Sequence, residues 1–488
     1  MKSSVRSISL LITAAMLLAV FAGCGGTGSN DTASVTTAEA ETATETTPAW
    51  TTAIPDDLNF DGGRFAIYNL ATGSYYYQIY SEELDGEVLN DAIYNRNEFL
   101  QSKYNFKMSE NLQKSVSVND ARSMILAGDN NYELIVTVDR DAWTLATEGL
   151  ARAYSDIPYI DLEREWWSQT VNEDISVYNR LFYSYGDYNL TCYSSVNVLM
   201  FSLGLAENYG LNDYYKTVRD GSWTLERFYA DAQLATTDLN GDGVFTIDDQ
   251  YGITSHNKQM LPCFWIGSGL RTITKNSEDE PQFALVGNEK FSSFYMDFSD
   301  RMHNGNVWFN TKVLPDYADC TVFKENRALF NVVRTHFIMR FYRDMEQDFG
   351  IIPFPKWDEA QEQYCSRSEG GCFNIVPISI PEESLDLIGA VMEVMSAYSR
   401  EYVVPVYYET LLKDKFARDV DSLEMLDLIF NYRIYDLGDT IWCNYIRDGV
   451  FAGMFDKHDL ALESKIASMD TSISAVIAST LELFAGLE

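Results

Sequence analysis

Apolar strand-like and helix-like segments alternate through the first folded part of the chain. Residues 64–70 (RFAIYNL), 104–108 and 133–138 (ELIVTV) have the short apolar composition of buried strands. Between them, residues 86–103 and 118–126 carry apolar side chains at helical spacing. Strands that alternate with helices pair in parallel, because each helix returns the chain to the same end of the sheet. The pattern therefore predicts an α/β sheet covered on both faces.

The 488 residues exceed the usual length of a single domain, which predicts two lobes. An aromatic, strand-rich stretch at 181–205 is expected to carry the chain into the second lobe, and a second crossing is expected near 373–380. The C-terminal hundred residues are predicted to be mostly helical. The other predicted elements are helices at 224–235 and 382–399 and strands at 328–333 and 350–353.

The N-terminus has the features of a secretory signal peptide. Two basic residues precede an apolar run from Ile8 to Phe21, which is too short for a durable membrane span. The residues up to Cys24 resemble the bacterial lipobox, whose cysteine receives a diacylglycerol, although Phe21 stands where leucine is usual. Ordinary secretion with an incidental cysteine is the alternative. Residues 27–57 are rich in threonine and cannot bury a core, so we expect a disordered tether outside the cell membrane.

These features together predict how the chain is divided. The predicted parts are a signal peptide (1–23), a lipidated cysteine and tether (24–57), lobe 1 (58–180, with about 373–400 returning to it), lobe 2 (181–372) and a C-terminal helical region packing on the lobes (401–488).

Acidic residues outnumber basic ones by two to one, with 72 Asp and Glu against 36 Lys and Arg. Removal of residues 1–23 takes away Lys2 and Arg6 and no acid, so the net charge of −36 becomes −38. A polyanion would be repelled at long range, which excludes nucleic acid as an expected partner. The six cysteines after Cys24 are too scattered for a disulfide scaffold, although Cys365 and Cys372 are near enough in sequence to close a small loop.

Four segments together resemble extracellular solute-binding proteins of the maltose-binding type. These segments are residues 86–108 (GEVLNDAIYNRNEFLQSKYNFKM), 220–254 (DGSWTLERFYADAQLATTDLNGDGVFTIDDQYGIT), 349–364 (FGIIPFPKWDEAQEQY) and 417–430 (ARDVDSLEMLDLIF). The resemblance implies a two-lobed, type II periplasmic-binding-protein fold with hinge crossovers that closes on a ligand. It also implies a monomer that delivers its ligand to the permease subunits of an ABC importer, without an organic cofactor or a catalytic step.

The aromatic content of 14% suits a sugar ligand, because a ring can cover the C–H face of a sugar while polar groups bind its hydroxyls. Ligands of open α/β sheets bind at the carboxyl ends of strands, and this selects the loops that follow predicted strands. The candidate ligand-binding residues are Tyr75, Tyr76, Asp139, Arg140, Trp143, Trp265 and Arg334. For each aromatic residue among them, a place in the core is the alternative.

An acidic segment in the predicted second lobe has the spacing of a calcium-binding loop. Oxygen-bearing residues stand at positions one, three, five and twelve, and Gly243 at position six permits a sharp turn. Position twelve is an aspartate, as in dockerin loops, where glutamate is more usual. An acidic turn without metal is the alternative to a structural Ca²⁺ site. The candidate metal ligands are Asp238, Asn240, Asp242, Val244, Thr246 and Asp249.

Two other functions share several of these features. A glycoside hydrolase also needs aromatic and acidic residues, but the sequence has no recognisable hydrolase segment and no GxGxxG, P-loop or GxSxG pattern. A surface lipoprotein that presents its ligand to a sensor, or holds glycan at the cell surface, would share every feature described above. The sequence therefore favours a carbohydrate-binding lipoprotein of an ABC importer and leaves a non-transport binding protein as the alternative.

Overall fold

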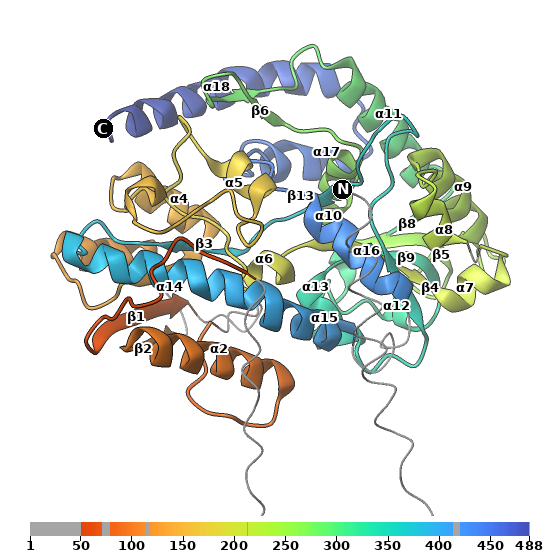
Figure 1. The fold of residues 1–488 in the computed structure, drawn as a ribbon. Helices are drawn as coiled ribbons and strands as arrows, with labels where there is room; N and C mark the ends of the chain where they lie inside the picture. The colour runs from red at the N-terminus through yellow and green to blue at the C-terminus, as the bar shows by residue number, and fades with distance from the viewer. Residues whose placement is uncertain (1–49, 71–78, 114–116, 212, 413–419, 488) are drawn as a thin grey trace, which may run out of the picture. The chain divides into compact units, whose positions relative to one another are not determined.

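The computed structural model describes residues 50–70, 79–113, 117–211, 213–412 and 420–487 (Figure 1). The predicted signal peptide, Cys24 and most of the predicted tether lie outside these ranges. Within the described ranges, no helix combines the length and the apolar character needed to cross a membrane.

A four-stranded sheet in the order β12-β3-β1-β2 forms the first lobe. β1 pairs in parallel with β2 and β3, whereas β12, from much later in the sequence, pairs antiparallel with β3. Helix α14 packs against β1 and α2, and α4 packs against β3 and β12, so helices cover both faces. The bounds are β1 (Gly63–Leu70), β2 (Phe106–Gln113), β3 (Leu134–Val138), β12 (Cys372–Ile375), α2 (Val88–Tyr104), α3 (Val118–Leu126), α4 (Asp139–Thr147) and α14 (Leu385–Tyr398).

A five-stranded sheet in the order β10-β4-β9-β5-β8 forms the second lobe. β5 pairs in parallel with β8 and β9, and β4 runs antiparallel to β9 and β10. The strands are β4 (Asn197–Ser202), β5 (Tyr251–Ser255), β8 (Trp308–Asn310), β9 (Ala328–Arg334) and β10 (Phe349–Ile352). The helices are α7 (Leu203–Asn208), α8 (Tyr214–Arg219), α9 (Leu225–Ala235), α10 (Asn257–Gly267), α11 (Glu289–His303), α12 (Thr321–Lys324) and α13 (Thr335–Phe337).

The chain enters the second sheet after α6 (Thr191–Ser194) and returns to the first through β11 (Ser366–Arg367), which directly precedes β12. Isolated bridges join Val196 to Ser368 and Ser184 to Asn374, so the outgoing and returning segments lie side by side. β11 also pairs with β13 (Arg433–Ile434) from the C-terminal region. These segments are the crossovers between the two sheets.

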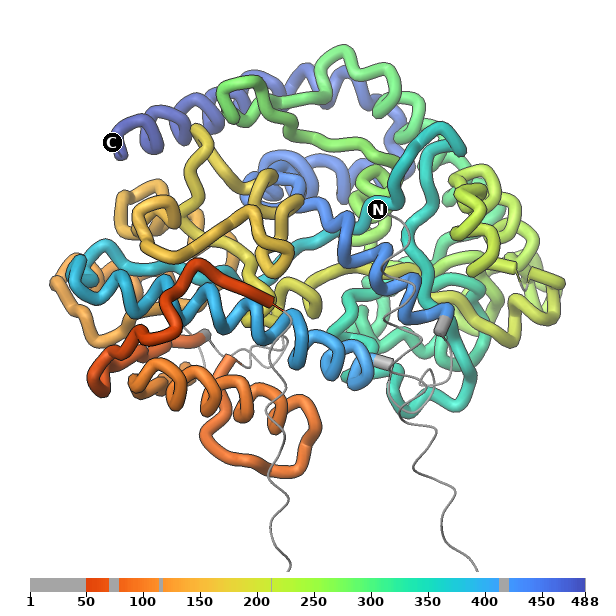
Figure 2. Tube along the Cα trace, in the orientation of Figure 1, coloured from red at the N-terminus to blue at the C-terminus, as the bar shows by residue number. Residues whose placement is uncertain are grey.

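The long helix α18 (Leu462–Ala485) packs against α11 of the second lobe and α4 of the first, and Figure 2 shows its course between them. The C-terminal region is thus tied to both lobes. The other elements between and around the sheets are α5 (Gln169–Ile175), β6 (Ile273–Lys275), β7 (Pro281–Phe283), α15 (Val404–Leu412), α16 (Val420–Asn431) and α17 (Ala452–Asp456).

The sequence prediction differs from the structure in two places. The second strand begins at Phe106 and not at Tyr104, because Asn105 takes the left-handed conformation (φ 50°) that ends α2 and turns the chain. The aromatic stretch at 181–205 contains one named strand, β4, preceded by the short helix α6. Its tyrosines at 183, 185 and 188 are buried in the core, where Tyr183 and Tyr185 contact Phe373 of β12, so burial accounts for the aromatic composition that suggested strands.

Candidate functional site

The carboxyl end of β3 carries a buried acid, Asp139, which begins α4 and is 5% exposed. The hydroxyl of Tyr435 donates a hydrogen bond to its Oδ2 at 2.8 Å, and the backbone N–H of Gly370 donates to the same atom at 3.3 Å. The backbone N–H of Arg140 donates to Oδ1 at 2.8 Å. A buried carboxylate needs such donors. Asp139 therefore fixes the first lobe, the returning crossover and the C-terminal region at one point.

The carboxyl end of β9 lies in a buried ion cluster of three arginines and two acids. Arg334, the last residue of β9, pairs with Glu369, next to Gly370 in the crossover. Arg367 makes a two-point contact with Asp439, through Nε to Oδ2 at 2.6 Å and Nη2 to Oδ1 at 2.9 Å. Arg447 Nη1 lies 3.3 Å from Asp439 and 3.5 Å from Glu369. The strand ends of the two lobes thus meet across Glu369 and Gly370.

Charged groups at the edge of this cluster reach solvent. The side chain of Arg140 is 55% exposed, with Nη1 3.7 Å from the Sγ atom of Cys443. Lys258, in the first turn of α10, lies 3.1 Å from Asp448. Although burial alone would raise the pKa of Asp448, the hydrogen bond and charge of Arg447 and the nearby Lys258 bring this pKa below its ordinary value. Asp448 therefore stays ionised and can accept hydrogen bonds from a ligand.

Aromatic side chains also gather after the carboxyl ends of β5 and β9, where Tyr317 contacts His256 and Phe337. His256 follows β5, and its ring centroid lies 4.9 Å from that of Tyr317, which in turn lies 6.0 Å from Phe337. Tyr317 is 38% exposed and Tyr445, two residues beyond Cys443, is 41% exposed. Burial, followed by the charge of nearby Lys258, lowers the pKa of His256 to about 4, so its imidazole is neutral near pH 7. We call the exposed charged and aromatic groups of this region the strand-end site. Its residues are Arg140, Lys258, Asp448, Tyr317 and Tyr445.

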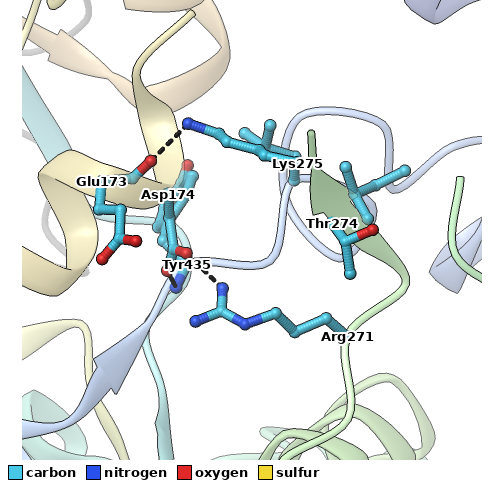
Figure 3. A pocket seen from close by; sticks show the side chains of 8 residues that line it. Glu173, Asp174, Arg271, Thr274, Lys275 and Tyr435 are labelled. Atoms are coloured by element: carbon cyan, nitrogen blue, oxygen red, sulfur yellow. Dashed lines mark hydrogen bonds and ion pairs between the residues drawn. The ribbon is translucent and has the colours of Figure 1, made fainter. Parts of the chain in front are cut away.

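A separate pocket of about 270 Å³ opens between α5, β6 and the chain just after β13 (Figure 3). Its floor includes Tyr435, whose backbone N–H donates to Asp174 at 2.8 Å. Burial raises the pKa of Asp174 to about 6, against the opposing charge of Arg271. The lining residues are Glu173, Asp174, Arg271, Ile273, Thr274, Lys275, Tyr435 and Leu437.

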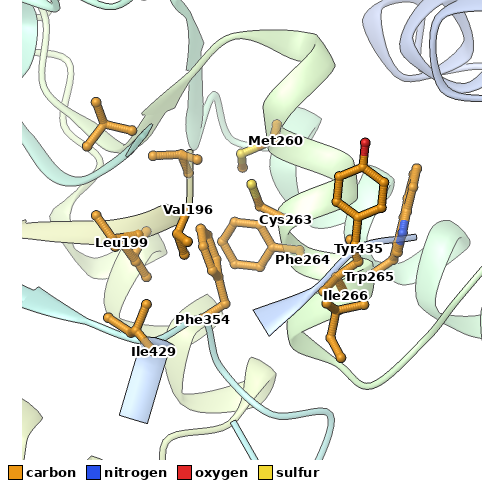
Figure 4. Close-up of a cluster of buried hydrophobic side chains, with 14 of the residues drawn as sticks. Val196, Leu199, Met260, Cys263, Phe264, Trp265, Ile266, Phe354, Ile429 and Tyr435 are labelled. Carbon is orange, nitrogen blue, oxygen red and sulfur yellow. The ribbon is translucent and has the colours of Figure 1, made fainter. Parts of the chain in front are cut away.

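The two tryptophans proposed from the sequence as ligand contacts are packed inside the protein. Trp143 is 6% exposed and meets Trp442 and Phe484 edge to face, at centroid distances of 5.6 and 5.4 Å. Trp265 is completely buried in the cluster drawn in Figure 4, and its ring lies 5.8 Å from Phe451. In this arrangement neither ring offers a face to a ligand.

The other proposed ligand contacts fall in different places. Tyr75 and Tyr76 lie outside the described residues. Asp139 and Arg334 are brought to the same crossover segment but are buried, at 5% and 9% exposed. Arg140 is the proposed residue whose charged group reaches solvent.

Sequence reasoning missed the residues that join the strand ends. None of these residues follows a long apolar strand, so a search restricted to loops after predicted strands does not select them. They are Glu369, Tyr435, Asp439 and Arg447. The signal available was the density of charged and small residues at 366–371 (SRSEGG) and of acids in 436–439 (DLGD). Such runs are common on solvated surfaces, and only the fold shows that these are buried.

The predicted calcium loop turns its acidic oxygens toward its own backbone. Asp238 accepts from the N–H groups of Gly241 at 2.8 Å and Gly243 at 2.7 Å, and Asp249 accepts from Thr246 at 2.7 Å. Gly243 has φ 82°, a conformation that favours glycine. Among the residues that the structure describes, no three His, Cys, Asp or Glu side chains are grouped as a metal site would require.

Two α/β lobes linked by crossovers, with a last strand returning antiparallel to the first sheet, define the two-lobed fold of type II periplasmic binding proteins. The cyclic α-maltosyl-1,6-maltose-binding protein of Arthrobacter globiformis matches with a TM-score of 0.57 and 11% identity, over 85% of this chain and 99% of that one. The lacto-N-biose-binding protein of the Bifidobacterium longum ABC transporter matches with a TM-score of 0.56 and 9% identity, over 86% and 98%.

A third similar structure is UgpB of Mycobacterium tuberculosis in complex with glycerophosphocholine, with a TM-score of 0.53 and 13% identity, over 86% of this chain and 99% of that one. No model of a known protein family matches the chain, and no curated protein matches its sequence. At these identities the likeness establishes the fold.

Proposed function

We propose that the chain is the extracellular solute-binding component of an ABC importer. As a monomer it captures a mono- or oligosaccharide between its two lobes and delivers it to permease subunits. The observation that carries the proposal is the meeting of strand ends from both sheets beside exposed charged and aromatic groups. Two of the similar structures described above are named as saccharide-binding proteins.

The strand-end site has the groups that a saccharide needs. Arg140 offers N–H donors and Asp448 offers acceptor oxygens. Tyr317 and Tyr445 are partly exposed aromatic residues, the residue type that covers sugar C–H groups. Binding and release of a ligand by two lobes needs no covalent step, so the proposed function is not enzymatic.

A calorimetric titration with mono- and oligosaccharides, guided by a thermal-shift screen, tests this proposal. We expect Arg140→Ala to weaken the affinity for the saccharide found by at least tenfold, which is the scale of one lost charge-assisted hydrogen bond. The matched control is Arg219→Ala, which removes an arginine paired with Asp421 and Glu424 on the surface. If no saccharide binds the wild-type protein, the proposed ligand class is wrong.

Uptake of the labelled saccharide by cells with and without the protein distinguishes import from display of ligand to a sensor. Loss of uptake on deletion, restored by the wild-type chain but not by Arg140→Ala, is the expected result. Unchanged uptake, together with retained binding, would favour the non-transport binding protein.

We propose that Cys24 carries the lipid that holds the protein on the outer face of the cell membrane. The proposal is supported by the apolar run and small residues before Cys24 and by the threonine-rich residues after it. In detergent phase separation, the wild-type protein should enter the detergent phase and Cys24→Ser the aqueous phase. Equal partitioning of the two proteins would contradict the proposed lipid anchor at Cys24.

We also propose that the loop from Asp238 to Asp249 binds a structural Ca²⁺. The support is its spacing of oxygen-bearing residues and the turn at Gly243; binding would require Asp249 to exchange backbone hydrogen bonds for the ion. Titration of chelator-treated protein with Ca²⁺ should show one site at micromolar to millimolar concentration, which Asp238→Ala removes. No heat of binding in that range would leave the loop as an acidic turn.

A further inference from the structure

Tyr435, which directly follows β13 in the C-terminal region, is completely buried but is connected to the strand-end site by its hydroxyl. This hydroxyl donates a hydrogen bond to Oδ2 of Asp139 at 2.8 Å. Burial, followed by the charge of Asp139, raises the pKa of Tyr435, so the hydroxyl keeps its proton and remains a donor. Because Tyr435 is not exposed, any effect that it has on a ligand passes through the groups that it contacts.

The hydroxyl of Tyr435 is fixed in place by two other contacts of the same residue. Its backbone N–H donates to Oδ2 of Asp174 at 2.8 Å. Its ring packs edge to face against Phe373 of β12, with the ring centroids 5.5 Å apart. A donor held in this way is in position before a ligand arrives, so binding does not have to order it.

Asp139 connects Tyr435 to Arg140, the next residue in the chain. Its Oδ1 atom accepts from the backbone N–H of Arg140 at 2.8 Å and lies 4.0 Å from the Nε atom of the guanidinium. Among the residues that the structure describes, the guanidinium has one other polar contact, the Sγ atom of Cys443 at 3.7 Å, and a thiol is a weak acceptor. The carboxylate of Asp139 is therefore the main polar group that orients the exposed side chain of Arg140.

We propose that Tyr435 is a positioning residue for ligand binding: it holds the carboxylate of Asp139 and thereby sets the direction of the Arg140 guanidinium. This inference rests on the proposed function of the strand-end site and adds a residue that does not touch the ligand. A buried tyrosine of the C-terminal region thus controls a ligand contact that belongs to the first lobe.

Tyr435→Phe tests the proposal, because it removes the hydroxyl and keeps the buried ring. Calorimetry should show a saccharide affinity weakened by roughly fivefold, less than on removal of Arg140, because the guanidinium is misdirected but still present. In the Arg140→Ala background the same change should have no further effect, since the residue through which Tyr435 acts is gone. Equal losses in the two backgrounds would show that Tyr435 supports the fold in general and would overturn the proposal.

The matched control is Tyr295→Phe. Tyr295 is also completely buried, and its hydroxyl donates to the backbone carbonyl of Asp459 at 2.8 Å, so this variant loses one buried hydrogen bond outside the strand-end site. We expect it to keep the wild-type affinity for the saccharide. A loss as large as that of Tyr435→Phe would overturn the proposal.

The ligand-free protein gives a second measurement. With isotope-labelled arginine, the NMR signal of the Arg140 Nε–H group is the one that disappears in Arg140→Ala. We expect Tyr435→Phe to shift this signal and Tyr295→Phe to leave it in place. Asp139→Asn keeps the size of the side chain but removes its charge; it should shift the signal too, and it carries the test if Tyr435→Phe does not fold. An unchanged signal in these variants would overturn the proposal.

Failure of this proposal and failure of the proposed function give different results. If a saccharide binds and Arg140→Ala weakens its binding, but Tyr435→Phe does not, the positioning role is wrong and the proposed function stands. If no saccharide binds the wild-type protein, the proposed function is wrong, and the Arg140 signal still decides whether Tyr435 orients this side chain.

Discussion

Glu393 on α14 is completely buried, and its two carboxylate oxygens accept hydrogen bonds from the indole N–H groups of Trp166 and Trp167, at 3.1 and 2.8 Å. The backbone N–H of Asp161 donates to it at 3.3 Å. Burial raises the pKa of Glu393 to about 7, although these donors oppose the shift. One acid thus fixes the segment that leads out of the first lobe.

The raised pKa makes stability depend on pH in a defined direction. Between the ordinary pKa near 4.5 and the folded value of about 7, the folded state holds the proton more tightly than the unfolded state. The contribution of Glu393 to the free energy of unfolding should therefore fall as the pH rises through this window, by on the order of 3 kcal/mol. Denaturant unfolding of wild type and Glu393→Gln at pH 4.5–8 measures this difference. A difference between the two proteins that does not change with pH would contradict the assignment.

At this scale, sequence reasoning identified residues next to a strand but not their partners. Asp139, Arg140 and Arg334 follow predicted strands and do lie at the junction of the lobes. Their partners Tyr435 and Glu369 are distant in sequence, and local periodicity carries no information about such contacts. The aromatic content was equally ambiguous, because the same ring suits a core and a sugar site.

Helix α18 contacts elements that are far from it in the sequence, α4 of the first lobe and α11 of the second. Its residue Phe484 is buried against Trp143 of α4 and Phe182, with ring centroids 5.4 and 5.5 Å apart. The helix begins near α11 of the second lobe, so this aromatic contact secures its far end on the first. The sequence predicted that the C-terminal hundred residues are mostly helical but could not show where this helix packs.

Phe484→Ala should detach the end of α18 from the first lobe. We expect a loss of about 3–5 kcal/mol in the free energy of unfolding, the usual cost of removing a buried phenylalanine ring. Hydrogen exchange should also speed up at the C-terminal end of α18 more than in β3. The control is Leu483→Ala, the neighbouring residue that is 51% exposed. Equal effects of the two substitutions would show that the contact is not specific.

The ion cluster joins β9, β11 and the C-terminal region. Asp439→Ala leaves Arg367, which is completely buried, without its two-point partner, so we expect a cost of about 3–5 kcal/mol in the free energy of unfolding. The pair Arg367→Met with Asp439→Leu should cost less than Asp439→Ala alone, because no buried charge is left unpaired. Chemical denaturation of the two variants decides this order, and the reverse order would mean that the charge pair itself supplies the stability.

The elements with clear local periodicity were predictable, whereas β12 and β13, which pair with distant parts of the chain, were not. β1, α2, α3, β3 and β9 follow the apolar periodicities of their segments. β12 was expected only as a crossing, because its pairing with β3 joins residues more than 200 positions apart, and β13 is two residues long. Short strands and long-range pairings depend on the rest of the fold and leave no pattern in sequence.

At the scale of the whole molecule, two sheets share a narrow set of crossover segments. Such a connection allows rotation of one lobe against the other about a few residues. The strand-end site lies where those lobes meet, so a ligand that contacts both lobes would favour the closed arrangement.

Binding of a saccharide should therefore make the protein more compact. We expect the radius of gyration measured by small-angle X-ray scattering to decrease at saturating saccharide, and Arg140→Ala to need at least tenfold more saccharide for the same change. A sugar that gives no thermal shift serves as the control. Calorimetric binding with an unchanged radius of gyration would mean that the lobes do not close.

The buried ions around Glu369 have a consequence for the environments in which the protein can work. In 0.1 M salt, the interaction between two exposed charges is largely screened when they lie more than roughly 10 Å apart. Buried pairs, from which water is excluded, are screened much less. The two chains of contacts that meet at Glu369 and Gly370 should therefore keep their strength in dilute and in brackish surroundings alike. The chain has a large excess of acids, so the repulsion between its exposed charges will depend on salt concentration. The buried contacts around Glu369 will not.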